Sequence, residues 1–146
     1  MKMLVVKLLL GAFIVAELQY GTMGGRVTSI LDFGALILCK TERNPLTFNG
    51  YGCYCGFGGQ GTPVDGLDRC CQVHDNCYGQ LQRNFSTLPY AIYFTPYAIN
   101  HLTCTCSTRQ LTEFQRGLCR CDEQAAACFN RNYYNSRYSG YDKSKC

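Results

Sequence analysis

The residues best suited to chemistry stand together in one short stretch, DRCCQVHDNC, from Asp68 to Cys77. It contains His74, one of two histidines in the chain, next to Asp75 and four residues after Cys70. An imidazole in such surroundings can be a metal ligand, a general base or a polar residue held among disulfides. Which of these roles applies depends on the face of the helix on which each side chain lies.

Two segments have the pattern of long helices, residues 64–83 and residues 119–132. Each carries two cysteines seven residues apart, which are Cys70 with Cys77 and Cys121 with Cys128. Seven residues make two helical turns, so the two cysteines of each helix share one face. In antiparallel helices Cys70 can reach Cys128 while Cys77 reaches Cys121, although twelve cysteines allow many other pairings.

His74 lies on the face of the first helix that carries Cys70 and Cys77. Asp122 follows Cys121 on the second helix, so the two disulfides would bring imidazole and carboxylate together. The carboxylate would fix the tautomer, and the other ring nitrogen could accept a proton from water. A buried histidine–carboxylate hydrogen bond without chemistry fits the same spacing, and spacing alone favours it.

Asp75 lies on a different face, four residues after Cys71. The segment 50–63 is too rich in glycine for regular structure and predicts a loop whose backbone makes a close approach. The loop offers Cys53 and Cys55 as partners for Cys71, and a Cys55–Cys71 bond would hold it against Asp75. Loop carbonyls with a carboxylate suit calcium. Zinc is disfavoured, because the cysteine spacings fit poorly and an oxidising compartment consumes thiols.

The composition predicts one domain in an oxidising compartment. The chain has 146 residues, twelve of them cysteine, which is typical of secreted disulfide scaffolds. A basic start leads into nine apolar residues, Leu8 to Ala16, too few to span a membrane but typical of a signal peptide. We expect a signal peptide over 1–16, with its end no later than about residue 20. A candidate propeptide over 17–26, cut after Arg26, and a mature domain over 27–146 would follow.

The charge argues against a nucleic-acid partner. The full chain carries a formal net charge of +4, and without residues 1–26 it keeps eleven basic and nine acidic residues, or +2. So weak a balance favours anionic membrane surfaces only slightly. Asn84 begins the sequon NFS, which could be glycosylated in a secreted chain.

Four further segments complete the expected elements. Residues 27–40 have apolar positions at helical spacing and predict a short amphipathic helix. Residues 84–101, rich in aromatic and β-branched side chains, predict a loop or short strands. Residues 103–119 predict a hairpin pinned by cysteines, and residues 132–146 predict an irregular tail that Cys146 ties down.

Two motifs resemble a known family. Residues Tyr51 to Tyr78, which end in RCCQVHDNCY, closely resemble the calcium loop and active-site helix of secreted phospholipases A2. Residues Cys119 to Phe129, CRCDEQAAACF, resemble the second catalytic helix, and the likeness extends over residues 29–146. Cys39, the segment NPLTFNGYG and the candidate propeptide are most similar to the pancreatic type.

The resemblance implies a fold and an activity. The fold would be mainly α-helical and disulfide-rich, with two long antiparallel linked helices, an N-terminal helix, a glycine-rich calcium loop and a small β-wing. The activity would be calcium-dependent hydrolysis of the sn-2 ester of glycerophospholipids to a fatty acid and a lysophospholipid at a membrane or micelle surface. The protein would be secreted and monomeric, and a protein receptor is a further candidate partner.

The resemblance also implies roles for single residues. His74 matches the general base, Asp122 the carboxylate that orients it, and Tyr78 a hydrogen-bond donor to that carboxylate. The backbone N–H of Gly56 matches an oxyanion donor. Calcium (Ca2+) would be bound by a side chain and three loop carbonyls, those of Asp75, Tyr54, Gly56 and Gly58. The residues that match the substrate site are Ile30, Phe33, Ile37, Phe48 and Tyr97. The first four suit a plain core as well.

The family's disulfide pattern uses all twelve cysteines, and three departures remain. The pairs would be Cys39–Cys104, Cys53–Cys146, Cys55–Cys71, Cys70–Cys128, Cys77–Cys121 and Cys106–Cys119. A seventh disulfide of the pancreatic type is absent, and its positions fall near Thr87 and at Phe114. The second active-site tyrosine, expected shortly before Cys104, is replaced by Asn100 or His101, so we expect a network one hydrogen bond short. The chain lacks tryptophan, an anchor at membrane interfaces, so we expect weak interfacial binding.

Two other functions stay open on the sequence. One is a weakly active or inactive relative on the same fold, which acts as a receptor ligand or membrane-binding module. Loss of the calcium aspartate or of the loop glycines would mark such a protein, and both are kept. The other is a structural extracellular module, which explains the cysteines but not His74 and Asp75 beside the glycine-rich loop.

Overall fold

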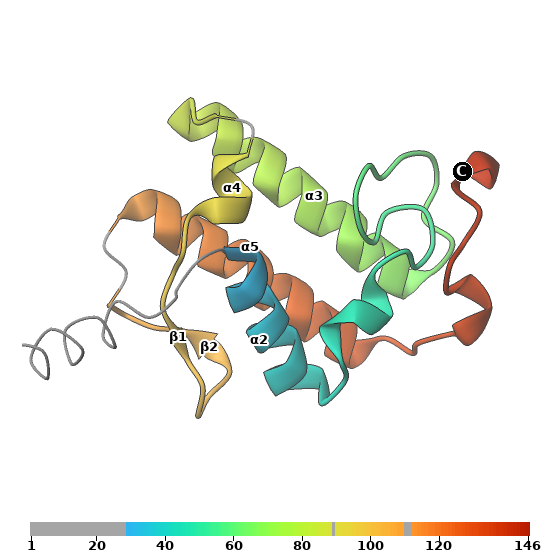
Figure 1. The fold of residues 1–146 in the computed structure, drawn as a ribbon, viewed down its shortest axis with the longest axis horizontal. Coiled ribbons are helices and arrows are strands. Elements are labelled where there is room, and N and C mark those ends of the chain that lie inside the picture. The colour runs from blue at the N-terminus through green and yellow to red at the C-terminus, as the bar shows by residue number, and fades with distance from the viewer. Residues whose placement is uncertain (1–28, 89, 110–111) are drawn as a thin grey trace, which may run out of the picture.

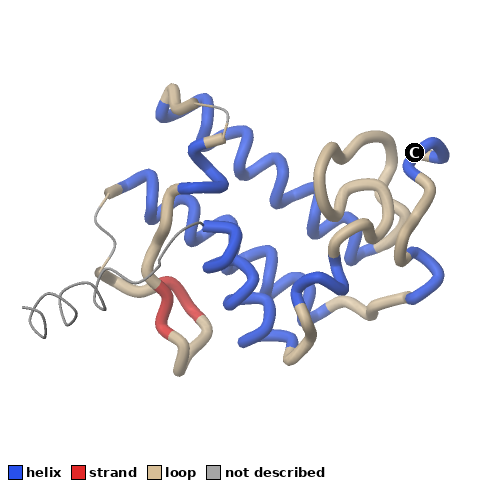
Figure 2. The backbone as a smooth tube through the Cα atoms, viewed as in Figure 1, coloured by secondary structure: helices blue, strands red, loops and turns tan. Residues whose placement is uncertain are grey.

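The computed structural model describes residues 29–88, 90–109 and 112–146. The predicted signal peptide and propeptide lie outside the described residues. Helices dominate this part of the chain, and strands contribute one small hairpin (Figures 1 and 2). In chain order the elements are α2 (Ser29–Thr41), η1 (Pro45–Phe48), α3 (Gly66–Phe85), α4 (Ala91–Phe94), β1 (Ile99–Asn100), β2 (Thr105–Cys106), α5 (Glu113–Arg131), η2 (Ser136–Tyr138) and η3 (Lys143–Lys145).

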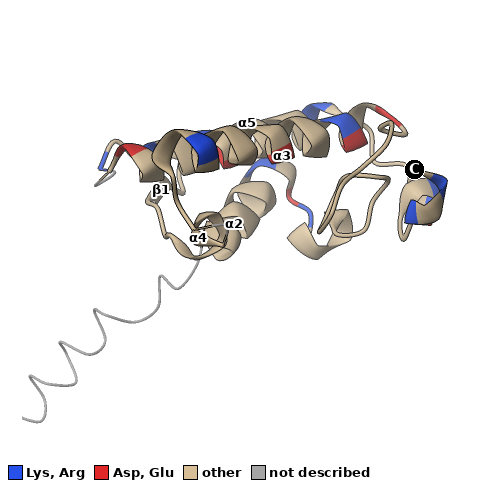
Figure 3. Ribbon diagram, turned by 90° about the horizontal axis from the view of Figure 1, so that it is seen from above, with Lys and Arg blue, Asp and Glu red and all other residues tan. Residues whose placement is uncertain are grey.

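The long helices α3 and α5 lie side by side and form one layer, with α2 and α4 beneath it (Figures 1 and 3). The disulfides Cys70–Cys128 and Cys77–Cys121 join the two helices. Because the earlier cysteine of α3 pairs with the later one of α5, the helices are antiparallel, which confirms the ladder. The other four predicted pairs are also present, namely Cys39–Cys104, Cys53–Cys146, Cys55–Cys71 and Cys106–Cys119.

The hairpin predicted over 103–119 is wrong in its second half. There α5 begins at Glu113, because Thr112 and Gln115 form a capping box in which each side chain accepts the other's backbone N–H. The actual hairpin pairs β1 with β2, with Ile99 opposite Cys106. The segment predicted as loop or strands likewise contains the one-turn helix α4 before β1.

The core lies between α2 and the layer of α3 and α5. Leu36 of α2, Leu67 of α3 and Leu118 of α5 are almost completely buried there. Each such side chain contributes roughly 1.5–3 kcal/mol by its removal from water. Phe48 of η1 stacks on Phe129 of α5, with ring centroids 4.8 Å apart. Within the described residues, no helix has the length and apolar character needed to cross a membrane.

Candidate active site

His74 and Asp122 meet between the two long helices. His74 Nε2 lies 2.6 Å from Oδ1 of Asp122. The imidazole is 11% exposed and stacks on Phe33 of α2, with ring centroids 4.5 Å apart. Because Nε2 is engaged by the carboxylate, Nδ1 is the ring nitrogen left to accept a proton. This is the geometry that a general base oriented by a carboxylate requires.

Asp122 is the centre of a buried hydrogen-bond network. Its side chain has no exposed surface, a state that is costly unless its oxygens are hydrogen-bonded. The Tyr78 hydroxyl donates to Oδ1 at 2.6 Å, and the Tyr97 hydroxyl donates to Oδ2. Burial first, and then the charge of Asp122, raises the pKa of both tyrosines above their ordinary value. Both therefore stay protonated and act as donors.

Tyr97 corrects two predictions. The residue is 2% exposed and is not among those that line the cavity, and its hydroxyl is engaged by Asp122 rather than by the substrate contact that the resemblance implied. It takes the place expected for the second tyrosine of the network, so the network is not one hydrogen bond short. Its backbone N–H donates to Asp32 at 3.1 Å, and the carbonyl of Pro96 accepts from Gln115 at 2.8 Å. The expected position, shortly before Cys104, was wrong because these long-range contacts fix the segment that carries Tyr97. The spacing to Cys104 along the hairpin does not fix it.

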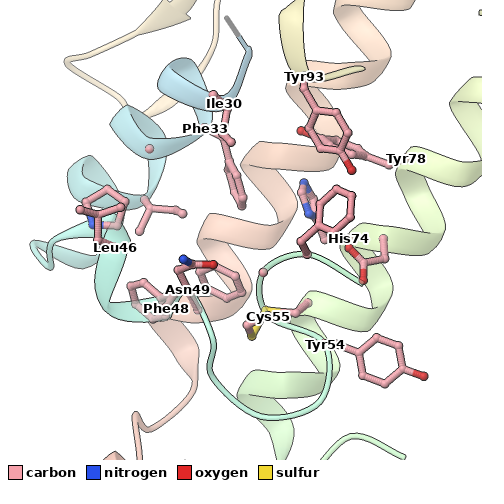
Figure 4. A pocket seen from close by; sticks show the side chains of 18 residues that line it. Ile30, Phe33, Leu46, Phe48, Asn49, Tyr54, Cys55, His74, Tyr78 and Tyr93 are labelled. Carbon is pink, nitrogen blue, oxygen red and sulfur yellow. A yellow bond between two sulfur atoms is a disulfide. The ribbon is translucent and has the colours of Figure 1, made fainter. Parts of the chain in front are cut away.

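A cavity of about 370 Å³ opens beside His74 (Figure 4). Apolar side chains from α2, η1 and the loop line much of it, namely Ile30, Phe33, Ile37, Leu46, Phe48 and Phe57. Figure 4 shows the imidazole between Phe33 on one side and Tyr78 and Tyr93 on the other. The four apolar residues matched to the substrate site thus border one cavity. The tyrosine of α4 that borders it is Tyr93.

The glycine-rich loop packs its backbone against Asp75. A Cβ atom on Gly59 would lie 2.8 Å from Oδ2 of Asp75 and 2.4 Å from the ring of Tyr54. Gly56 and Gly58 have φ angles of 104° and 76°, which L side chains rarely adopt. At Gly59 the loop therefore approaches the Asp75 carboxylate so closely that only a glycine fits there.

The carboxyl group of Asp75 has a raised pKa. Partial desolvation beside the loop raises the pKa of its carboxyl to about 6, although the residue keeps exposed surface and the nearby His74 and Lys143 lower the pKa. Burial disfavours the charged form, and a bound cation would restore it. The described residues contain no cluster of three carboxylate, imidazole or thiol groups that could hold a metal. A cation here would take its other ligands from loop carbonyls, a donor set that fits calcium.

Asp68 holds the base of the loop, a role that no pattern in the sequence predicts. Its buried carboxylate accepts the backbone N–H groups of Cys53, Tyr54 and Val64 at 2.8, 2.8 and 2.9 Å. A Cβ atom on Gly52 would lie 2.4 Å from the same carboxyl group. An acid in the first turn of a helix is expected for the helix dipole alone, so the pattern carried no signal of the longer contact.

Comparison with known proteins decides the family, because the family model described as Phospholipase A2 matches residues 30–139. The chain belongs to the phospholipase A2 family. Phospholipase A2 of Bos taurus is 40% identical over 134 residues, 86% of this chain and 90% of that protein. Phospholipase A2 of Oryctolagus cuniculus is 42% identical, covering 88% of this chain and 94% of its own. Basic phospholipase A2 of Micrurus corallinus is 37% identical, with 95% of each chain covered.

In this member of the family, aromatic packing occupies one of the two positions that the resemblance assigns to a seventh disulfide. Phe114 of α5 meets Phe85 of α3 edge to face, with ring centroids 5.4 Å apart. Such a pair contributes about 0.5–1.5 kcal/mol beyond its area burial, less than the typical 2–4 kcal/mol of a disulfide. The contact joins α3 to α5.

Proposed function

We propose that this phospholipase A2 is a secreted, calcium-dependent enzyme that hydrolyses the sn-2 ester of glycerophospholipids. The observation that carries the proposal is the His74–Asp122 pair in the wall of an apolar cavity, beside Asp75 and the glycine-rich loop. Membership of the family supports a lipolytic hydrolase. The products would be a fatty acid and a lysophospholipid.

In the proposed mechanism His74 is the general base. Its Nδ1 accepts a proton from a water molecule, whose oxygen attacks the ester carbonyl carbon. Asp122 holds the ring and stabilises the imidazolium that forms, while the backbone N–H of Gly56 donates to the developing oxyanion. When the tetrahedral intermediate collapses, the ester C–O bond breaks and His74 returns its proton to the departing alkoxide. The enzyme is then restored for another turnover.

Asp75 would hold calcium together with the backbone carbonyls of Tyr54, Gly56 and Gly58. When bound, the ion would supply positive charge to the substrate phosphate and to the oxyanion. The close packing of the loop on Asp75 at Gly59 supports the part of Asp75 in this ligand set.

A phospholipid membrane or micelle surface is the proposed partner. Ile30, Phe33, Ile37 and Phe48 would receive the acyl chains. At the mouth of the cavity the side chains of Leu46 and Phe57 are 75% and 82% exposed, and both also line it. Figure 3 shows the charged residues mainly on α3, α5 and the C-terminal turn, while α4 has none. Docking would therefore depend on apolar contact more than on charge.

Processing completes the proposal. Residues 1–16 would be removed as a signal peptide, and residues 17–26 as a propeptide cut after Arg26, which leaves a monomeric domain over 27–146. N-terminal sequencing of the secreted protein tests this. A mature chain that begins near Glu17 would exclude the second cleavage.

Fatty-acid release from mixed phospholipid micelles, with calcium or with a chelator, tests the activity. We expect release only with calcium, and a loss of at least about 100-fold in kcat for His74→Gln. His101→Gln is the matched control, because His101 is exposed and lies outside the cavity. Correctly oxidised protein that releases no fatty acid would favour the alternative, a binding protein on the same fold.

A further inference from the structure

The ammonium group of Lys143 contacts the centre of the glycine-rich loop. Its Nζ donates a hydrogen bond to the backbone carbonyl of Phe57 at 3.0 Å, across a separation of 86 residues. Phe57 stands between Gly56 and Gly58, two of the residues whose carbonyls would bind calcium. Lys143 thus holds the peptide unit that joins two proposed ligands.

The tip of the loop has few restraints of its own. Among the described backbone-to-backbone hydrogen bonds, none involves residues 56–59. The side chain of Phe57 is 82% exposed and does not anchor the loop. Asp68 and the Cys55–Cys71 disulfide fix the base of the loop. The order of the tip therefore depends on packing, as at Gly59 against Tyr54 and Asp75, and on hydrogen bonds donated from outside the loop.

The segment that carries Lys143 is well fixed. Asp142 caps η3 by accepting the backbone N–H of Ser144 at 3.0 Å. The Cys53–Cys146 disulfide ties the C-terminus to the start of the loop. A Cβ atom on Gly61 would lie 1.9 Å from the carbonyl oxygen of Cys146, so the end of the chain also packs directly on the end of the loop. Lys143 thus reaches the tip from a rigid support.

We propose that Lys143 is a positioning residue for calcium, which orders residues 56–59 in the conformation that binds the ion. This inference rests on the calcium-dependent function proposed above. Two effects oppose each other, because a cationic side chain near the site also repels calcium. Lys143 is only half-buried and its hydrogen bond to Phe57 is exposed, so water and salt screen the repulsion. If residues 56–59 are ordered before calcium binds, binding no longer carries the entropic cost of ordering them, and salt does not screen this gain. We therefore expect the ordering of the loop by Lys143 to outweigh its repulsion of calcium.

Calorimetric titration with calcium chloride tests this on the full oxidised protein. We expect Lys143→Met to weaken calcium binding by about tenfold, the loss of one charged hydrogen bond. Lys143→Arg keeps a cationic donor and should stay within about twofold of the wild type. Lys145→Met is the matched control: Lys145 lies in the same turn, is 67% exposed and is paired with Asp142, and its loss should leave affinity unchanged.

Hydrogen exchange gives a second readout in the calcium-free protein. Amides of residues 57–60 should exchange faster in Lys143→Met than in the wild type or in Lys145→Met. Equal or tighter calcium binding by Lys143→Met, or an equal loss in Lys145→Met, would overturn the inference alone. A wild-type protein that binds no calcium would overturn the proposed function as well, so the two failures are distinguishable.

Discussion

Tyr97 donates a hydrogen bond to Oδ2 of Asp122, the carboxylate oxygen that His74 does not use. Tyr78 donates to the other oxygen, which also binds the imidazole. Both oxygens of the buried carboxylate are therefore occupied, and its plane is held from two sides. Asp122 orients His74, and the two tyrosines in turn hold Asp122 in place. Tyr78 and Tyr97 come from separate segments of the chain.

Removal of the Tyr97 hydroxyl should therefore cost both stability and rate. We expect Tyr97→Phe to lower the free energy of unfolding by about 1.5–3 kcal/mol, because a buried carboxylate loses one donor. The kcat for fatty-acid release should also fall, as Asp122 holds the imidazole less firmly. Urea unfolding with the disulfides intact measures the first effect. Tyr133→Phe is the control, since Tyr133 is 85% exposed; equal stability of the two variants would contradict the network.

Calcium affinity should depend on pH through Asp75. The pKa of this carboxyl is raised to about 6 in the folded, calcium-free protein, from an ordinary 3.8. Because the folded pKa is the higher one, the stability of the calcium-free protein falls as pH rises from about 4 to 6. Calcium must displace a proton below about pH 6, so its affinity should fall up to about tenfold per pH unit there and be constant above.

Calcium titrations at pH 5, 6, 7 and 8 measure this dependence. The increase in melting temperature that calcium causes should also be larger at pH 8 than at pH 5. Asp75→Asn should bind calcium weakly at every pH. An affinity that stays constant down to pH 5 would mean that the carboxyl titrates at its ordinary pKa.

A methyl group at Gly59 should damage the loop selectively. In Gly59→Ala the new Cβ would lie 2.8 Å from Oδ2 of Asp75, so either the carboxylate or the loop must move. We expect calcium affinity to fall about tenfold or more, the usual cost of overpacking. In the control, Gly79→Ala, the Cβ meets only the flexible end of Arg83 at 3.4 Å. That helical change should instead stabilise the fold by about 0.5–1 kcal/mol. Wild-type affinity in Gly59→Ala would contradict the close packing.

Phe57 should contribute directly to binding at a lipid surface. Its exposed ring would enter the apolar layer, so Phe57→Ser should lower partitioning to phosphatidylcholine vesicles by about tenfold. Sedimentation with sucrose-loaded vesicles measures this. Leu102→Ser removes an apolar side chain that is 96% exposed in the hairpin turn, away from the cavity, and should leave partitioning unchanged. If Phe57→Ser and Leu102→Ser lower partitioning to the vesicles equally, the mouth of the cavity is not the docking face.

The sequence by itself determined those features that depend on periodicity, local caps and spacing. Seven-residue spacing placed two cysteines on one face of each long helix, and His74 fell on that face for the same reason. The glycine-rich loop and Asp75 were equally readable, because a backbone that must approach a carboxylate closely needs residues without a Cβ atom. The start of α5 was readable in principle from the capping box of Thr112, but the cysteine pattern masked it.

Only the tertiary structure decided which residues complete the site. Tyr97 reaches Asp122 across 25 residues, Asp68 bonds loop amides 14 and 15 residues away, and Lys143 reaches Phe57 across 86. No helical or strand periodicity predicts these pairs, because each contact joins two different elements that packing brings together. Local pattern specifies the face on which a side chain lies, whereas its partner depends on how the whole chain folds around the core.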